Sequence, residues 1–348
     1  MTIDKGIIIR NIYYMLTYAF QDLRHNNYDD IAGEDFDNIL DLFAEILFRG
    51  VSFQLKRGLH KDYITHSDNL TTIKGKININ ESIRQKFLHK KLIGCTFDEF
   101  SENNIHNQIL KSTLLLLTKS QEVKLARRRR LRSLLLFLSN VESCNLANIR
   151  WCQITYDRNS STYRMLHHFC YCVIKRMLLT TESGAYKTMN FDEELMSRLF
   201  EKFVLSYYRK HYPQLSAKSA KVEWNIDADE STLSLIPEMK TDILLTFPTH
   251  TLIIDTKYYS QSMQEYMGKA SIRNNNLYQI NSYVLHEDKN HSGSVDGMLL
   301  YAKTQEEVCP DGQMKLNDGN TLYFRNLDLN QDFGNIKHQL DSFINKYR

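Results

Sequence analysis

Apolar residues at helical spacing recur over most of the chain and predict a protein rich in amphipathic helices. In these segments an apolar residue returns every three or four positions, which places the apolar side chains on one face of a helix. Leu195, Leu199 and Phe203 illustrate the pattern. The segments predicted to be helical are Ile7–Leu23, Asp37–Leu55, Glu102–Lys119, Lys124–Leu138, Met165–Leu179, Asp192–Tyr208, Asn276–Leu285 and Asn335–Lys346.

Other segments carry the pattern of β-strands, with β-branched and aromatic residues between turn-forming residues. Helices and strands alternate along the chain, so we expect an α/β (α+β) protein with a mixed sheet flanked by helices. The segments predicted to be strand-like are Leu55–Ile79, Thr241–Phe247, Thr251–Tyr259, Gly297–Ala302 and Thr321–Leu327.

A polar stretch divides the chain. Residues Asn140–Arg164 lose clear periodicity, so we place a domain boundary near the end of this stretch. The expected domains are residues 1–164 and 165–348. A length of 348 residues is compatible with two ordinary domains.

The two strands around Pro248 should form a hairpin that carries charged residues within apolar sequence. With an even number of loop residues, the register pairs Asp242 directly with Asp255. Side chains alternate faces along a strand, so Asp255 and Lys257 share one face. Directly opposed side chains lie roughly 4.5–5.5 Å apart at Cβ, where like charges are destabilising. Two opposed carboxylates therefore predict a bound cation.

This constellation suits metal-assisted hydrolysis of a phosphodiester. Mg²⁺ is commonly held by one or two carboxylates together with substrate phosphate oxygens. Lys257 would lie about 7 Å along the same face, two residues from Asp255, within reach of a phosphate or an attacking water. The alternative is an edge hairpin whose aspartates and lysine are solvated. Charges placed within such apolar strands favour a functional role.

Composition narrows the class of protein further. Hydrophobic residues make up 42% and charged residues 24%, as in soluble globular proteins, and the net charge of +3 permits nucleic-acid contact without requiring it. The six cysteines form no CxxC pair, and no stretch resembles a signal peptide or a membrane span. These features favour a cytoplasmic protein. No G-x-x-x-x-G-K-[ST] motif occurs, so any dependence on a nucleoside triphosphate must come from a partner.

Two further segments invite a functional interpretation. Five arginines between Lys124 and Leu138 cannot share one helix face, so some must be solvated and some could pair with acids. We expect a mainly solvated helix, with docking on an acidic partner or contact with DNA as alternatives. The string HHFCYC, residues 167–172, suggests metal ligands. On one helix, however, these side chains scatter around the axis, and structural zinc expects ligands in separated pairs. We therefore do not expect zinc there.

Several motifs together resemble the McrC family, the nuclease subunits of McrBC modification-dependent restriction systems. Asp242, Asp255 and Lys257, with Pro237 upstream, look like the signature of the PD-(D/E)xK nuclease superfamily. The resemblance extends to other parts of the chain, namely IIIRNIYYMLTYAF (Ile7–Phe20), IKGKI (Ile73–Ile77), FDEFSENNIHNQILKSTL (Phe97–Leu114) and the DTKYY that ends the hairpin.

The resemblance implies roles for individual residues. Asp242, Asp255 and the Thr256 carbonyl would hold Mg²⁺, and Lys257 would act beside them in catalysis. Glu201, on the helix before the hairpin, is a further candidate metal ligand, although McrC-like proteins do not require an acid there. Gln279 and Tyr283 are similar to the Q-x-x-x-Y element of RecB-like nucleases, which packs near the active site and touches the DNA strand.

The resemblance also implies partners. A hexamer of an McrB-like AAA+ GTPase would bind GTP, read 5-methylcytosine and dock on the N-terminal domain of this chain, which would stimulate GTP hydrolysis. The substrate would be methylated double-stranded DNA, and cutting both strands calls for dimerisation within the working complex. The alternatives are a non-cleaving activator of the GTPase, or a RecB-like exonuclease acting alone.

Overall fold

The computed structural model divides into two compact units, Met1–Leu42 with Leu179–Arg348 and Phe43–Leu178. We call them the first and the second unit. Helices α2 (Ile39–Arg57) and α6 (Ser161–Ser183) each carry residues of both. The structure describes residues 3–4, 7–20, 23, 31, 33–157, 160–183, 185–227, 229–233, 235–259, 263–266, 269–303 and 309–347.

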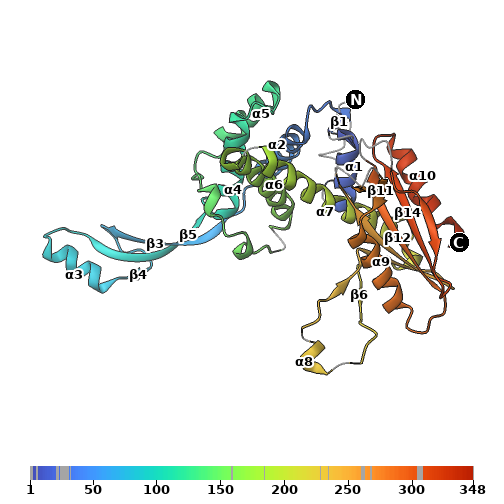
Figure 1. Ribbon diagram of the computed structural model, residues 1–348. Coiled ribbons are helices and arrows are strands. Elements are labelled where there is room, and N and C mark those ends of the chain that lie inside the picture. Colours follow the sequence, from blue (N-terminus) through green and yellow to red (C-terminus); the bar gives the residue numbers. More distant parts are fainter. Residues whose placement is uncertain are drawn as a thin grey trace. The chain divides into compact units, whose positions relative to one another are not determined.

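A five-stranded mixed sheet forms the centre of the first unit (Figure 1). Its strand order is β13-β14-β12-β9-β8, in which β12 runs parallel to β9 and β14, while the two outer strands are antiparallel to their neighbours. Strands β12 and β9 are almost wholly buried, as expected for parallel strands covered on both faces. The strands are β8 (Ile243–Thr246), β9 (Thr251–Lys257), β12 (Val295–Lys303), β13 (Gly312–Lys315) and β14 (Thr321–Asp328).

Helices lie on both sides of this sheet. Helix α9 (Asn274–Glu287) packs on β9 and β12, where Gly297 allows the close approach, because a Cβ there would come within 2.8 Å of Ile280, Val284 and Leu322. Helix α10 (Phe333–Ile344) contacts β14 from the other side (Figure 1). Helix α7 (Ala185–His211) contacts β9, and α1 (Ile9–Ala19) packs on α7.

Short elements complete the first unit. Three two-stranded ribbons pair β1 with β2, β6 with β7 and β10 with β11, and α8 follows β6. The bounds are β1 (Ile3–Asp4), β2 (Ile7–Ile8), β6 (Lys221–Val222), α8 (Glu230–Leu233), β7 (Met239–Lys240), β10 (Met263–Tyr266) and β11 (Lys269–Ile272).

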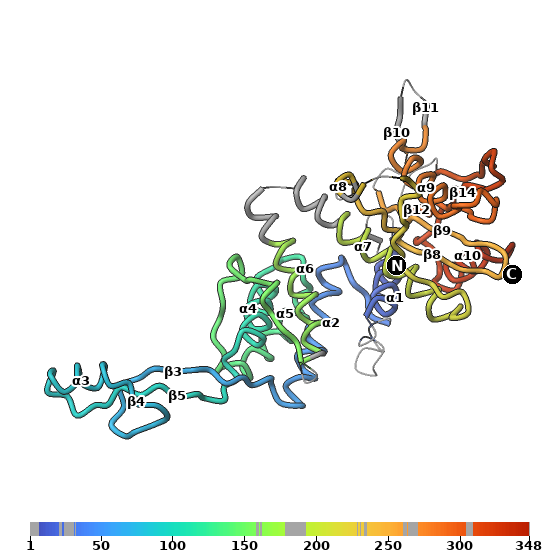
Figure 2. The backbone as a smooth tube through the Cα atoms, turned by 90° about the horizontal axis from the view of Figure 1, so that it is seen from below, coloured from blue at the N-terminus to red at the C-terminus, as the bar shows by residue number. Residues whose placement is uncertain are grey.

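The second unit combines a helical body with a projecting arm. Helices α4 (Ile105–Lys119) and α5 (Leu125–Leu136) pack against each other, and their buried side chains form the core together with those of α2 and α6. The arm, residues 62–101, contains β3 (Asp62–Leu70), β4 (Lys76–Ile77), α3 (Ile79–Phe87) and β5 (Ile93–Ser101). Figure 2 shows it extending away from the helices of this unit.

The arginine-rich helix is only partly solvated, because two of its arginines pair with an acid inside the unit. On α5, Arg127 is buried and Arg130 is half-buried, and both form ion pairs with the fully buried Glu45 of α2. The Nε atom of Arg127 lies 3.3 Å and Nη1 of Arg130 lies 2.9 Å from Oε2 of Glu45. Arg49 binds the other carboxylate oxygen at 2.8 Å. Part of the positive charge is therefore used inside the unit.

The predicted boundary near residue 164 differs from the observed division. Helix α6 runs without interruption through Arg164, and buried residues from Tyr163 to Ile174 keep this part of the helix within the second unit. The first 42 residues belong with the C-terminal part of the chain, where Asn11 donates hydrogen bonds to the carbonyls of Leu329 and Gln331. Periodicity shows where helices form but not which distant segments pack together.

The predicted fold class is confirmed, because the chain is mixed α/β with helices flanking a mixed sheet. Among the described residues, no helix combines the length and the apolar character needed to cross a membrane.

Candidate active site

The hairpin of β8 and β9 has the predicted register. Thr246 pairs with Thr251 and Ile243 with Ile254, and the four-residue loop is closed by a hydrogen bond from the Phe247 N–H to the His250 carbonyl. The predicted register of two strands joined by an even-numbered turn is therefore confirmed.

The ladder of β8 and β9 stops one pair short of the predicted pairing of Asp242 with Asp255. Strand β8 begins at Ile243, so Asp242 lies just outside the ladder. Its Oδ2 atom accepts hydrogen bonds from both the backbone N–H and the hydroxyl of Thr256, each at 2.7 Å. These two donors hold the Asp242 carboxylate at the end of β9, on Thr256, the residue that follows Asp255.

Asp255 and Lys257 form a buried ion pair on the face of β9 that α9 covers. Oδ2 of Asp255 lies 2.7 Å from Nζ of Lys257, and their side chains are only 2% and 13% exposed. The pKa of Asp255 is raised to about 6, mainly by burial and in part by the charge of Asp242, while Lys257 opposes the shift. Burial alone would lower the pKa of Lys257, but the Asp255 carboxylate reverses this and raises it. Lys257 is therefore held as a cation.

A chain of hydrogen bonds connects Lys257 to α9. Lys257 Nζ donates to Gln279 Oε1 at 2.9 Å, and Gln279 Nε2 donates to Tyr283 Oη at 2.8 Å. Tyr283 in turn donates to the carbonyl of Lys240 at 3.0 Å, two residues before Asp242. The i and i+4 spacing of Gln279 and Tyr283 thus brings both residues to the site, as expected. Tyr283 is only 6% exposed and acts here as a support.

Glu201 on α7 lies in the electrostatic field of the same site. Burial raises the pKa of Glu201, and Asp242 raises it further. Glu201 in turn contributes to the raised pKa of Asp255. Within the described residues, however, the ligand atoms of Asp242, Asp255 and Glu201 are not among the groups of three that lie within 4.8 Å of one another. A role for Glu201 in binding metal therefore stays a prediction.

The donor set fits a divalent metal. Two carboxylates converge at one end of β9, and one of them is kept in a buried position where its own charge is unfavourable. A hard cation with oxygen ligands would relieve this cost. Thr256 orients Asp242 through its N–H and hydroxyl. That role was not predicted from the sequence, which offered only the Thr256 carbonyl as a ligand.

Sequence reasoning also missed Tyr301 and Asn276 at this site. Tyr301 pairs with Lys257 in the parallel register of β12 and β9, and its hydroxyl accepts a hydrogen bond from Asn276. Asn276 also accepts one from Tyr259. Only the pairing of β12 with β9 places Tyr301 there, and a single sequence does not fix the order of strands.

We expect the stability of the metal-free protein to depend on Asp255 in mildly acidic solution. The folded-state pKa of about 6 lies above the ordinary value of 3.8, so the stability contributed by protonated Asp255 is lost as pH rises from about 4 to about 6. At most about 3 kcal/mol is involved. Urea unfolding in the presence of a chelator should show this loss in the wild type, relative to Asp255→Asn. Parallel pH profiles of the two proteins would contradict the assignment.

Comparison with known proteins agrees with this fold. A model of the family described as "McrBC 5-methylcytosine restriction system component" matches residues 5–302. The type IV methyl-directed restriction enzyme EcoKMcrBC of Escherichia coli K12 is 28% identical over 347 residues, covering 98% of each chain. In a solved half-complex of Thermococcus gammatolerans McrB AAA+ hexamers with bound McrC, one chain matches with a TM-score of 0.53 and 15% identity, covering 96% of this chain and 79% of that chain. That structural likeness shows a shared fold. The family match spans most of the sequence, and the chain therefore belongs to the family of McrBC 5-methylcytosine restriction system components.

Proposed function

We propose that this chain is the Mg²⁺-dependent endonuclease subunit of a modification-dependent restriction complex that cleaves methylated DNA. The observation that carries the proposal is the buried Asp255–Lys257 pair, set beside an Asp242 carboxylate that Thr256 holds in place. Membership of the McrBC family supports the assignment to restriction.

Each residue of the site has a physical task in this proposal. Asp242 and Asp255, with the Thr256 carbonyl, would bind the ion. When bound, Mg²⁺ would polarise the scissile phosphate and lower the pKa of a coordinated water. Lys257, fixed by Asp255 and Gln279, would neutralise charge that develops on the phosphate or orient the attacking water. Gln279 would keep Lys257 in position next to the DNA strand.

The tip of the arm is the proposed docking surface for an AAA+ GTPase partner. Helix α3 exposes an apolar stripe at i, i+4 and i+8, in which Ile79, Ile83 and Phe87 are 69%, 48% and 79% exposed. On the same helix Gln85 is buried. This is the reverse of a helix that packs on its own domain, and such exposed apolar surface marks an interaction site. The similar chain of Thermococcus gammatolerans is bound to McrB hexamers, which supports this kind of partner.

Replacing Ile79, Ile83 and Phe87 together by glutamine should lower stimulation of the partner's GTP hydrolysis by about tenfold or more. Apolar anchors at the centre of an interface each contribute roughly 2 kcal/mol or more, and glutamine keeps the helix propensity. GTP turnover measured against the concentration of this subunit checks the effect. The exposed Lys86→Gln on the same helix is the matched control. Equal stimulation by the triple variant and the control would exclude α3 as the docking surface.

Cleavage of cytosine-methylated and unmethylated plasmid in the presence of Mg²⁺, GTP and an McrB-like AAA+ partner tests the proposal. We expect cutting of the methylated plasmid only, and only when both subunits are present. GTPase stimulation without cutting would identify a non-cleaving activator. Cutting by this chain alone would identify an independent nuclease.

A further inference from the structure

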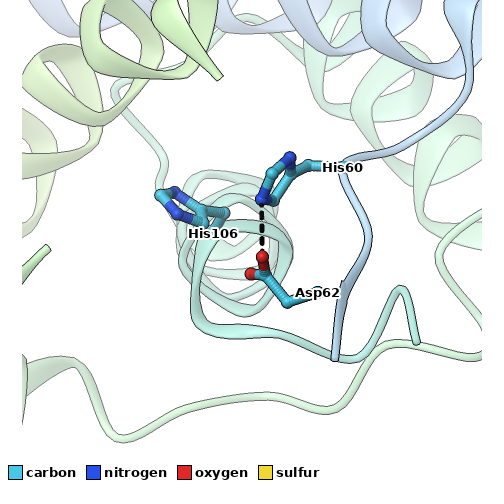
Figure 3. Close-up of side chains that lie close together, drawn as sticks. All are labelled: His60, Asp62 and His106. Atoms are coloured by element: carbon cyan, nitrogen blue, oxygen red, sulfur yellow. Dashed lines mark hydrogen bonds and ion pairs between the residues drawn. The ribbon is translucent and has the colours of Figure 1, made fainter. Parts of the chain in front are cut away.

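A second cluster of possible metal ligands lies in the second unit, apart from the nuclease residues. Among the described residues, His60, Asp62 and His106 form a group whose ligand atoms all lie within 4.8 Å of one another. Figure 3 shows the three side chains next to one another, with His60 Nε2 3.0 Å from Asp62 Oδ1. All three line a cavity of about 620 Å³. The cluster therefore has room for a coordinated water.

The surrounding structure holds His60 in place through its backbone. The His60 N–H donates to the hydroxyl of Tyr163 at 3.0 Å, and the His60 carbonyl accepts from the side-chain amides of Asn104 and Asn107, each at 2.8 Å. The Tyr163 hydroxyl also donates to Asn107 Oδ1 at 2.7 Å. Tyr163 and Asn107 are buried. Such a buried, satisfied network positions a ligand before any ion binds.

His106 supplies a buried nitrogen without a hydrogen-bond partner. The side chain is 6% exposed, and no group in the described part of the chain hydrogen-bonds its Nδ1 atom. An unpartnered buried polar atom is costly unless an ion or a water satisfies it. The neighbouring His167 differs, because its Nε2 bonds the His106 carbonyl and its Nδ1 bonds the Tyr156 hydroxyl. With both nitrogens occupied, His167 supports the cluster and is not one of its ligands.

We infer that His60, Asp62 and His106 form a binding site for a divalent transition metal, with Zn²⁺ as the best fit. Two imidazoles and a carboxylate suit Zn²⁺, whereas Mg²⁺ and Ca²⁺ prefer oxygen ligands. In a tetrahedral Zn²⁺ shell with bonds of about 2.0–2.1 Å, ligand atoms lie about 3.3 Å apart. The observed ligand atoms lie within 4.8 Å of one another, so binding would draw them closer by up to about 1.5 Å. The fourth position would be left for a water in the cavity.

The position of the site gives the metal a structural task. Asp62 is the first residue of β3, where the arm begins, and His106 lies in the first turn of α4, just after the arm ends. A bound ion would join both chain segments at the base of the arm. The arm would then be anchored to the helical body of its own unit, independently of the nuclease site.

Zn²⁺ titration of the tag-free chain tests the inference. The titration uses an Asp255→Asn background, so that the nuclease site contributes less to the signal. We expect one Zn²⁺ per chain by isothermal titration calorimetry, and a tetrahedral Co²⁺ absorption spectrum in the same protein. His106→Ala should weaken Zn²⁺ binding by more than about 100-fold, because even changes to groups behind a ligand cost about 10–100-fold. His66→Ala, which removes another β3 histidine outside the cluster, should leave binding unchanged.

If His106→Ala fails to fold, Asp62→Asn is the second variant. It removes a charge at a half-buried position and keeps the volume of the side chain. It should also weaken Zn²⁺ binding strongly. The inference would be overturned if the Asp255→Asn protein bound no Zn²⁺. It would also be overturned if neither Asp62→Asn nor His106→Ala altered the Zn²⁺ isotherm.

Discussion

Replacing Asp255 by asparagine should reduce DNA cleavage by roughly 10³-fold or more, which corresponds to about 4 kcal/mol of transition-state stabilisation. Asp255 is 1% exposed and lies 2.7 Å from Lys257. A neutral amide of the same size removes one of the two carboxylates offered to the metal, and it removes the charge that keeps Lys257 in its present place. The fold should survive, because burial already disfavours the charged form of this side chain. Rates of methylated-plasmid cleavage under saturating partner and GTP measure the effect.

Asp341→Asn is the matched control for this experiment. Asp341 also belongs to the first unit, and its Oδ1 atom accepts hydrogen bonds from the hydroxyls of Tyr207 and Tyr212. Asparagine can still accept these bonds through its remaining oxygen. Loss of a carboxylate at this position should therefore leave the cleavage rate near that of the wild type. Equal losses in the two variants would mean that general destabilisation, rather than the chemistry of Asp255, explains the result.

Replacing Glu45 by alanine should destabilise the second unit by about 3–5 kcal/mol. Glu45 is fully buried and binds Arg49, Arg127 and Arg130. Removing this acid breaks the ion pairs that join α2 to the buried Arg127 and the half-buried Arg130 of α5. An uncompensated buried charge costs far more than a lost surface ion pair.

Tryptophan fluorescence can follow this effect in the second unit alone. The chain has two tryptophans, Trp151 in the second unit and Trp224 in the first. In a Trp224→Phe background, urea unfolding reported by Trp151 should shift strongly with Glu45→Ala. It should hardly change with Glu99→Ala, an exposed acid on the arm. If the urea midpoint of Glu45→Ala equalled that of the control, the ion pairs of Glu45 would contribute little to the stability of the second unit.

Local patterns were sufficient for the hairpin and most helices. Helix α2 was predicted as Asp37–Leu55 and is observed at Ile39–Arg57, and strand β12 was predicted within its observed bounds. The register of the catalytic hairpin follows from alternation and a four-residue turn, both of which are local properties. The spacing of Gln279 and Tyr283 likewise fixes their shared face on α9.

Contacts between distant segments could not be read from one sequence. The two partners of Glu45 on α5 are Arg127 and Arg130, which lie 82 and 85 positions away, and nothing in the apolar stripe of α2 identifies them. Strand β5 mixes apolar and polar residues without clear alternation, so the arm was recognised along β3 and β4 but not along β5. The hydrogen bond of Asp242 with Thr256 depends on where β8 begins. The ends of a strand are its least predictable feature, so this contact could not be predicted. His60 and His106 likewise meet only through the fold.

DNA cleavage and GTP hydrolysis recorded in the same reactions test the central claim most directly. The reactions would contain methylated plasmid, Mg²⁺, GTP, the AAA+ subunit and either the wild type or Asp255→Asn. We predict that the wild type stimulates GTP hydrolysis and cuts the plasmid, and that Asp255→Asn stimulates GTP hydrolysis to the same extent without cutting. Cleavage by Asp255→Asn at the wild-type rate would contradict the assignment of the active site.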